Sequence, residues 1–163
     1  MREPSESAAS IAEVLDALGV RWTIIGALAA LEYRADVRIT TDADFLVEWR
    51  DDLVEALEGA GFDVEIVADA GEPPHVLYVH GKGVKADLML PVVEYQRVAL
   101  DRAGRYLAIE DVIVHKLLAW RPRDRDDVAS ILATDPELDE DYIEHWAHEW
   151  EVRDRWDQAL RSR

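Results

Sequence analysis

The chain has 163 residues, of which 49% are hydrophobic, and its formal net charge is −17. This length suits one domain with a sizeable core, and the negative charge excludes general binding to duplex DNA because it would repel the phosphates. Because cysteine is absent, the chain cannot form a disulfide scaffold, a thiolate nucleophile or a zinc-thiolate centre, so a metal would need oxygen or imidazole ligands.

Hydropathy and lysine content indicate the cellular compartment and the salt concentration in which the protein works. No apolar run reaches the roughly 18 residues of a membrane span, and the first seven residues lack the apolar segment of a signal peptide, so we expect a cytoplasmic protein. Lysine occurs only at Lys82, Lys85 and Lys116. An acidic, lysine-poor surface suits a salt-rich cytoplasm, because salt screens the repulsion between like charges.

The first half of the chain alternates helix and strand signals. Apolar residues at helical spacing predict a helix over 7–18 that ends at Gly19, and further helices are predicted over 27–33 and 51–60. Runs of β-branched, aromatic or alternating apolar residues predict strands over 20–25, 38–47, 62–67, 75–80 and 84–90. The segment Gly81-Lys82-Gly83 is expected to close the last two strands into a hairpin.

The second half is expected to be helical. The segment 92–103 fits a helix or a strand, and its Glu, Gln, Arg and Leu content favours the helix. Amphipathic helices are predicted over 110–120, 126–132 and 140–160, with breaks at Pro122 and Pro136. We therefore expect an α+β fold with a mixed sheet of about four or five strands packed with helices, followed by a helical C-terminal extension. The single domain 1–163 would comprise a sheet-containing core, 1–106, and a helical part, 107–163.

Two aspartates in an apolar strand form the most informative motif. Asp42 and Asp44 are two residues apart, so a strand places both carboxylates on one face. Such a pair repels and loses solvation, so it persists most readily where a divalent cation lies between the carboxylates. Asp87 repeats the arrangement in the predicted strand 84–90. Three acids of this kind can hold two Mg²⁺ or Mn²⁺ ions, which clamp the attacking and leaving oxygens in phosphoryl transfer.

At these residues the sequence resembles the nucleotidyltransferase superfamily typified by polymerase beta, and within it the toxin-like AbiEii and MenT branch. The resemblance spans about residues 20–133 and rests on Gly26, Arg38-x-Thr40-x-Asp42-x-Asp44, Asp87, Glu110-Asp111, Lys116 and Arg123-Asp124-Arg125-Asp126-Asp127. It implies metal binding by Asp42, Asp44 and Asp87, and nucleotide binding by Gly26, Ala27, Arg38, Thr40 and Lys116. It also implies catalytic roles for Asp42, Asp44, Asp87, Lys116 and Asp126.

The chain departs from that family directly after the glycine. Gly-Ser or Gly-Gly is usual there, whereas Gly26-Ala27 lacks a hydroxyl for a phosphate and brings a methyl group to the backbone. The departure supports an alternative, a noncatalytic nucleotide- or protein-binding module of a toxin-antitoxin pair. The acid triad favours the enzyme, because a pure binding module gains nothing from the desolvation cost of three carboxylates.

The other candidate residues each have a structural alternative. Lys116 lies in an apolar run and either reaches a triphosphate or extends to solvent. Arg38 would share the strand face of the acid pair, so it binds either phosphate or the acids themselves. Asp126 is expected to orient Lys116 or Arg123, although any carboxylate is favoured at a helix start. Lys85 shares a strand face with the third acid and most simply neutralises it.

The C-terminal aromatic residues have two interpretations. Tyr142, Trp146, Trp150 and Trp156 could stack bases, but their helical spacing with Ile143 and Leu160 favours packing in the core. His145 and His148 are three residues apart and are expected to face solvent rather than to share a metal.

The residues and the resemblance together predict a metal-dependent enzyme that moves a nucleoside monophosphate from an NTP to a hydroxyl acceptor and releases pyrophosphate. The resemblance implies an acceptor that is tRNA or protein, and a separate antitoxin protein as partner. Hydrolysis at the same acids stays open, because only the acceptor differs. No membrane and no general duplex DNA are expected among the partners.

Overall fold

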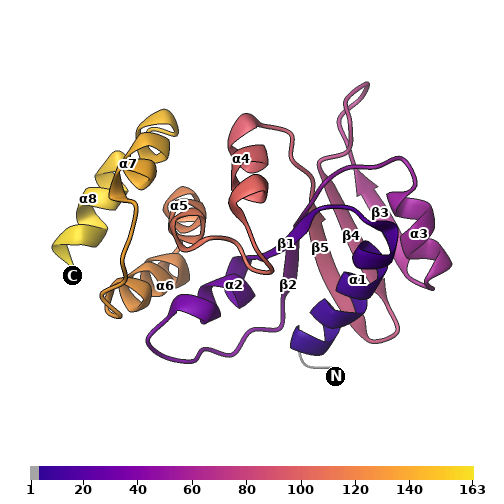
Figure 1. Ribbon diagram of the computed structural model, residues 1–163, viewed down its shortest axis with the longest axis horizontal. Coiled ribbons are helices and arrows are strands. Elements are labelled where there is room, and N and C mark those ends of the chain that lie inside the picture. The colour runs from indigo at the N-terminus through magenta and orange to yellow at the C-terminus, as the bar shows by residue number, and fades with distance from the viewer. Residues whose placement is uncertain (1–3) are drawn as a thin grey trace.

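The computed structural model describes residues 4–163, and Figure 1 shows a sheet flanked by helices with a helical group at the C-terminal end. Residues 1–3 lie outside the described residues. They belong to the N-terminal segment in which we expect no signal peptide. The strands are β1 (Trp22–Ile25), β2 (Ala43–Val47), β3 (Asp63–Val67), β4 (Val76–Gly81) and β5 (Val84–Met89). The helices are α1 (Pro4–Leu18), α2 (Gly26–Tyr33), α3 (Leu53–Gly59), α4 (Glu94–Arg102), α5 (Ile109–Ala119), α6 (Pro122–Leu132), α7 (Glu140–Glu149) and α8 (Arg153–Arg161).

The five strands form one mixed sheet in the order β1-β2-β5-β4-β3. β2 pairs antiparallel with β1 and parallel with β5, and β4 pairs antiparallel with both β5 and β3. The parallel pair lies at the centre of the sheet, where it sets residues 43–46 opposite residues 86–89. This α+β architecture confirms the predicted fold class; the division at residue 106 stays a prediction.

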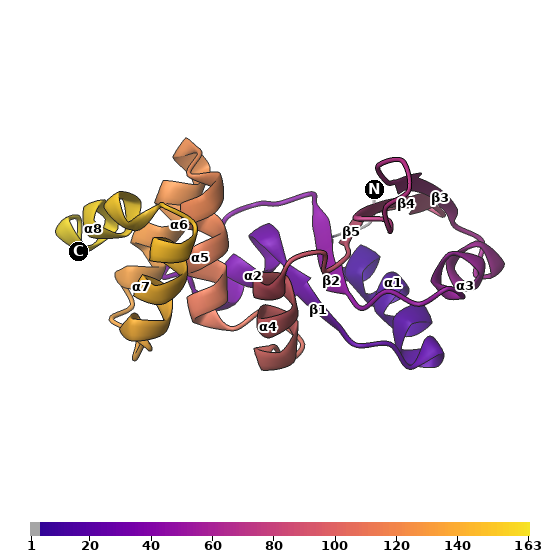
Figure 2. The same cartoon turned by 90° about the horizontal axis from the view of Figure 1, so that it is seen from above.

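Side chains of the strands alternate between two hydrophobic cores, one on each face of the sheet. Phe45 and Val47 lie in the core that α1 and α3 complete, whereas Leu46 lies in the core built largely from α2 and α4 to α8. In Figure 2, α1 and α3 lie at the end of the molecule that holds β3 and β4, while α5 to α8 gather at the other end. Asp44 has the same parity as Leu46, so its carboxylate faces the side of α2 and α5.

Most predicted elements are confirmed, including the hairpin, and the ambiguous segment 92–103 contains the helix α4. The strand predicted over 38–47 is shorter, because the pairing with β1 stops at Ile25 and Asp44, where Gly26 begins a helix. The helix predicted over 126–132 starts earlier, with Pro122 in its first turn. The helix predicted over 140–160 is two helices, since the chain turns between them at Glu151, which has φ 57°.

Among the C-terminal aromatic residues, Trp156 lies in the core and Trp146 packs against it, as their spacing predicts, whereas Trp150 stays partly exposed. Trp156 and Ile143 are completely buried, and the ring of Trp146 lies 4.8 Å from that of the buried Tyr95. Trp150 is 38% exposed and meets Tyr95 edge-on. His145 and His148 are exposed on α7, as expected. Across residues 4–163, no helix combines the length and the apolar character needed to cross a membrane.

Candidate functional site

Two of the three predicted acids lie directly opposite each other at the centre of the sheet. Asp44 of β2 and Asp87 of β5 are register partners in the parallel pair, so their side chains share the face that α2 and α5 border. Asp42 lies just before β2 and is exposed. The charges of Asp87 and Asp42 both raise the pKa of Asp44. The fold therefore brings Asp44 and Asp87 together and leaves Asp42 exposed next to them, and the shared role of the three acids stays a prediction.

The backbone at Gly26 lies against the Asp44 carboxylate. Gly26 has φ 66°, a conformation that side chains disfavour, and a Cβ there would overlap Oδ2 of Asp44 and come within 3.2 Å of its Cγ. Residue 26 therefore has to be glycine for two reasons, the positive φ of its backbone and the close approach of that backbone to the Asp44 carboxylate. It also begins α2, whose N-cap residue Ile25 provides no side-chain hydrogen bond, and Ala27 follows it. The N-terminal amides of α2 thus begin next to the acids.

Burial and mutual repulsion favour the protonated forms of two of the acids. Burial, followed by the charges of Asp87 and Asp42, raises the pKa of Asp44 to about 6, although Lys116 and Arg123 oppose this rise. Burial also raises the pKa of Asp87, with a further contribution from Asp42 and an opposing one from Lys85. A carboxylate with a raised pKa gains from a nearby cation, so the site favours positively charged occupants.

The donor set fits a hard divalent metal in its chemistry, since all three side chains offer carboxylate oxygens. Within residues 4–163, however, no three or more Asp, Glu or His side chains converge on one point as a bound metal requires. Asp42 is the exposed member, so its side chain would have to turn toward Asp44 and Asp87.

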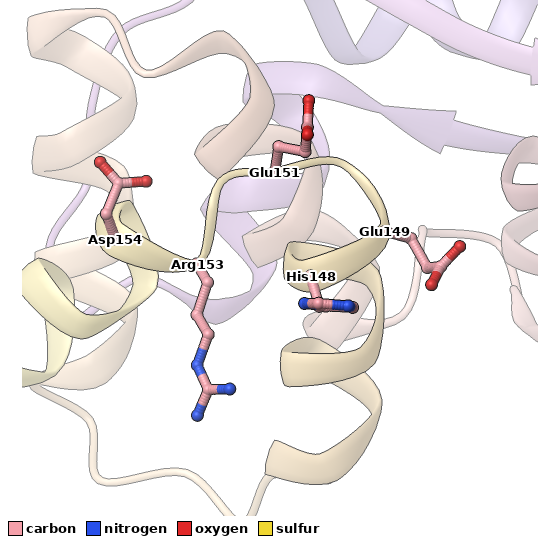
Figure 3. Close-up of a pocket in the computed structure, with 5 residues that line it drawn as sticks. All are labelled: His148, Glu149, Glu151, Arg153 and Asp154. Carbon is pink, nitrogen blue, oxygen red and sulfur yellow. The ribbon is translucent and has the colours of Figure 1, made fainter.

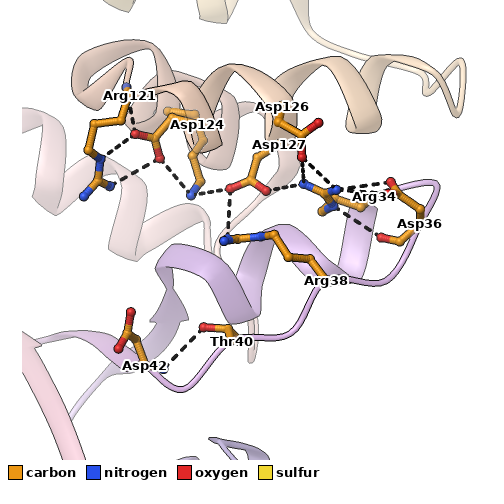
Figure 4. A network of polar contacts seen from close by, with 10 residues as sticks. Arg34, Asp36, Arg38, Thr40, Asp42, Arg121, Asp124, Asp126 and Asp127 are labelled. Atoms are coloured by element: carbon orange, nitrogen blue, oxygen red, sulfur yellow. Dashed lines mark hydrogen bonds and ion pairs between the residues drawn. The ribbon is translucent and has the colours of Figure 1, made fainter.

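A chain of buried charges lies beside the acids and links α5 to α6 (Figure 4). The Lys116 side chain is 8% exposed, and its Nζ lies 2.7 Å from Asp127 Oδ2 and 3.2 Å from Asp124 Oδ1. Arg121 Nε donates to Asp124 Oδ2 at 2.7 Å. Burial works against ionisation of Asp124, but the hydrogen bond from Arg121 and the charge of Lys116 lower its pKa. Lys116 therefore neither extends to solvent nor lies free for a phosphate.

The same network holds the segment between α2 and β2. Asp127 is fully buried and also pairs with Arg34, whose side chain is only 2% exposed, and with Arg38 at 3.3 Å. Among the described residues, Arg38 Nε is buried without a hydrogen-bond partner. Further along, the Asp42 backbone N–H donates to Thr40 Oγ1 at 3.3 Å. Asp127 thus fixes the start of the segment that delivers Asp42 to the site.

Two expectations need correction here. Asp126 does not orient Lys116, since its 65% exposed side chain pairs with Arg34, while Asp124 and Asp127 bind the lysine. The helical period is the reason, because residues three apart on α6 face the same side and Asp126 lies off that side. Arg38 does not share a strand face with the acids, because its segment has no strand partner, and it pairs with Asp127 instead.

Sequence reasoning missed Arg34 as a member of this network. The signal available was the Asp-x-x-Asp spacing of Asp124 and Asp127, which predicts two carboxylates on one helical face and therefore cationic partners. The acids Glu110 and Asp111 belong elsewhere. Asp111 is buried and accepts hydrogen bonds from Arg102 and Tyr142, so it anchors α7 on α5 rather than contributing to the acid cluster.

Two surface hollows lie apart from the acids. One of about 440 Å³ lies where α7 meets α8, and its side chains, His148, Glu149, Glu151, Arg153 and Asp154, point in different directions in Figure 3. Another of about 870 Å³ is lined by residues after β2 and β5, including Trp49 and Pro91. Neither hollow is lined by the three acids. The acid cluster, with Gly26 and the neighbouring cations, is the stronger candidate site because Asp44 and Asp87 are register partners beside the start of α2.

Solved structures share the fold of this chain. An antigenic nucleotidyltransferase-like protein from Paracoccidioides brasiliensis matches with a TM-score of 0.52 and 18% identity, over 98% of this chain and 92% of that one. The chain has a nucleotidyltransferase-like fold. A candidate nucleotidyltransferase from H. pylori gives a TM-score of 0.49 and 18% identity over 77% of this chain. A cytoplasmic RNA terminal U-transferase gives 0.47 and 14% identity over 81% of this chain.

These likenesses concern the nucleotidyltransferase-like fold alone. The chain spans 65% of the H. pylori protein and 39% of the U-transferase, which is less than two thirds of either length. No family model and no curated protein matches the sequence.

Proposed function

We propose that this protein is a metal-dependent nucleotidyltransferase that moves a nucleoside monophosphate from an NTP to a hydroxyl acceptor. The observation that supports it most strongly is the register pairing of Asp44 with Asp87 beside the glycine that opens α2. The charge of Asp87 disfavours ionisation of Asp44, and a divalent cation between the two carboxylates would relieve the repulsion. The nucleotidyltransferase-like fold supports the same class of reaction.

Each acid has a role in this proposal. Asp42, Asp44 and Asp87 would hold two Mg²⁺ or Mn²⁺ ions, which when bound would neutralise phosphate charge and make the acceptor hydroxyl more acidic. In the transfer, the acceptor oxygen bonds to the α-phosphorus, the bond from that phosphorus to pyrophosphate breaks, and the hydroxyl proton passes to water. In this proposal Asp87 would help to hold the ion that activates the acceptor hydroxyl, and Asp42 and Asp44 would hold the ions that contact the nucleotide phosphates.

The cations around the acids would bind the triphosphate. The first amides of α2, at Gly26 and Ala27, offer donors to a phosphate at a helix N-terminus. The Arg38 side chain is 26% exposed and could turn its guanidinium from Asp127 toward a phosphate, and Arg123 is exposed at the start of α6. Lys116 is held by two carboxylates, so it would support the site rather than contact the triphosphate, and Thr40 would hold the Asp42 backbone.

The finer assignment within the superfamily rests on the sequence motifs. The order of Gly26, the acid pair, Asp87 and Lys116 resembles the AbiEii and MenT branch, so we propose a toxin-antitoxin component with an antitoxin protein as partner. The acceptor would then be tRNA or protein. With a net charge of −17, any contact with RNA must be confined to a local patch.

Three observations favour a second candidate, the noncatalytic module. Asp42 is exposed and the described acids do not converge on a metal position, while Ala27 replaces a residue that could bond a phosphate. A module of this kind would bind a nucleotide or a protein without transferring anything.

Pyrophosphate release separates the two candidates. The protein would be incubated with Mg²⁺, each NTP and either total tRNA or a protein extract, beside Asp87→Asn. The enzyme predicts metal-dependent pyrophosphate release that the variant lacks. Release that is absent from the wild type, while NTP binding is retained, supports the noncatalytic module and contradicts the enzyme.

A further inference from the structure

An open stretch of sheet continues from Asp87 on the side of the acids. Tyr78 of β4 is the register partner of Asp87, and His80 is the partner of Lys85, so all four side chains share one face. The alternate residues Leu77 and Val79 are buried in the core with α1 and α3. Tyr78 is 42% exposed, the His80 side chain is 60% exposed, and Lys85 is exposed. An aromatic ring and two basic groups therefore stand in solvent beside the third acid.

Lys85 differs from the other two lysines in its contacts. Lys116 is buried between Asp124 and Asp127, and the Lys82 ammonium donates to the Ala60 carbonyl. Among the described residues, Lys85 makes no ion pair and no hydrogen bond through its side chain, although it lies two residues from Asp87 on the same face. Its charge partly offsets that of Asp87, but its exposed ammonium can still pair with an anion that comes to the open face.

We infer that Tyr78, Lys85 and His80 form the acceptor subsite of the proposed transferase, and that its occupant is the 3′ end of a single-stranded RNA. Tyr78 would stack on the terminal base, Lys85 would pair with a backbone phosphate, and the terminal hydroxyl would then lie at Asp87. Aromatic stacking and a cation are the two features that single-stranded binding uses without sequence readout. This inference rests on the proposed function.

The acidic neighbours limit the length of RNA that this face can take. Glu65 lies opposite Tyr78 on the next strand, and Asp63 lies opposite His80, with its Oδ2 3.9 Å from the imidazole Nε2. Both carboxylates are on the edge strand β3, so a backbone crossing the whole sheet would meet repulsion. The subsite therefore fits one or two terminal nucleotides that enter beside β5, and not a duplex.

Two measurements test the subsite, and the first does not depend on catalysis. Fluorescence anisotropy with a 5′-fluorescein-labelled single-stranded RNA of about 12 nucleotides, at low salt, would give the Kd. We expect Tyr78→Ala to weaken binding about tenfold, Tyr78→Phe to retain it, and Lys85→Gln to weaken it severalfold. Lys82→Gln removes the same charge nearby and serves as the matched control, with binding close to that of the wild type.

The second measurement is steady-state transfer to the same RNA. Tyr78→Ala should raise the KM for RNA about tenfold and leave the KM for NTP unchanged. Equal RNA binding by the wild type and Tyr78→Ala, or transfer to protein but not to RNA, would overturn the subsite while the transferase proposal stands. If the wild type transfers to no acceptor, the transferase proposal is overturned. The anisotropy measurements would then test only whether Tyr78 and Lys85 bind RNA.

Discussion

The backbone of Gly26 lies so close to the carboxylate of Asp44 that any side chain at residue 26 would displace it. Gly26→Ala should therefore both strain the backbone, at φ 66°, and push the acid out of register with Asp87. We expect a loss of about 2–4 kcal/mol in unfolding free energy. Transfer activity should fall as well, and chemical denaturation beside the activity assay would measure both effects.

Gly19→Ala is the matched control for that substitution. Gly19 has φ 73°, but a Cβ there would meet no atom within 4 Å, so the control carries the conformational cost alone. It should lose about 1 kcal/mol and keep full activity. Equal destabilisation by the two variants would contradict the close contact between residue 26 and the acid.

The raised pKa of Asp44 predicts how stability depends on pH. The Asp44 carboxyl has a pKa of about 6 in the folded protein, whereas in the unfolded chain its pKa is near the ordinary value for aspartate. Because the unfolded chain loses the proton more readily, ionisation of Asp44 destabilises the fold as pH rises from 4 to 7. Asp44→Asn should remove this dependence and stabilise the protein at pH 7 by an amount on the order of 1–2 kcal/mol. Thermal unfolding at a series of pH values would test it, and a variant less stable than the wild type at pH 7 would argue against it.

The buried Asp127 should matter far more than its exposed neighbour. Asp127→Asn would remove the carboxylate partner of Arg38 and one of the carboxylates that hold Lys116 and Arg34, at a cost of about 3–5 kcal/mol. Asp126→Asn, at a side chain that is 65% exposed, should change stability by less than about 0.5 kcal/mol. Urea denaturation of the two variants compares them directly, and similar losses would refute the role given to Asp127.

The acidic surface predicts that salt stabilises the protein. The net charge is −17, so screening should lower the repulsion within the fold as salt concentration rises. Denaturation midpoints at low and molar KCl would measure the effect. Equal or greater stability at low salt would count against the salt-rich habitat that the composition suggests.

Local sequence patterns predicted the parts of the site that lie within regular elements. The alternation around Asp44 and Asp87 placed each acid in a strand, and Gly26 between a strand and a helix marked the start of α2. Their pairing depends on which strands are neighbours, and the parallel placement of β5 beside β2 is a long-range property that no local pattern contains.

The partners of the buried charges could not be predicted for the same reason. Arg34 and Asp127 are 93 residues apart in sequence and meet only because α2 and α6 pack close together. Residues 38–42 do not form the expected strand. A strand needs a neighbouring strand for its backbone hydrogen bonds, and β1 is too short to pair with these residues. Asp126 was favoured over its neighbours by motif matching alone, whereas helical geometry selects Asp124 and Asp127.

Radiolabel transfer tests the central claim most directly. The protein would be incubated with each α-³²P-labelled NTP, Mg²⁺ or Mn²⁺, and total tRNA or a protein extract, beside the variant Asp42→Ala/Asp44→Ala. We predict that label enters one acceptor class with the wild type in the presence of metal, and that the variant transfers none while it stays folded. Label that enters equally with the variant, or no transfer by a wild type that still binds NTP, would contradict the account.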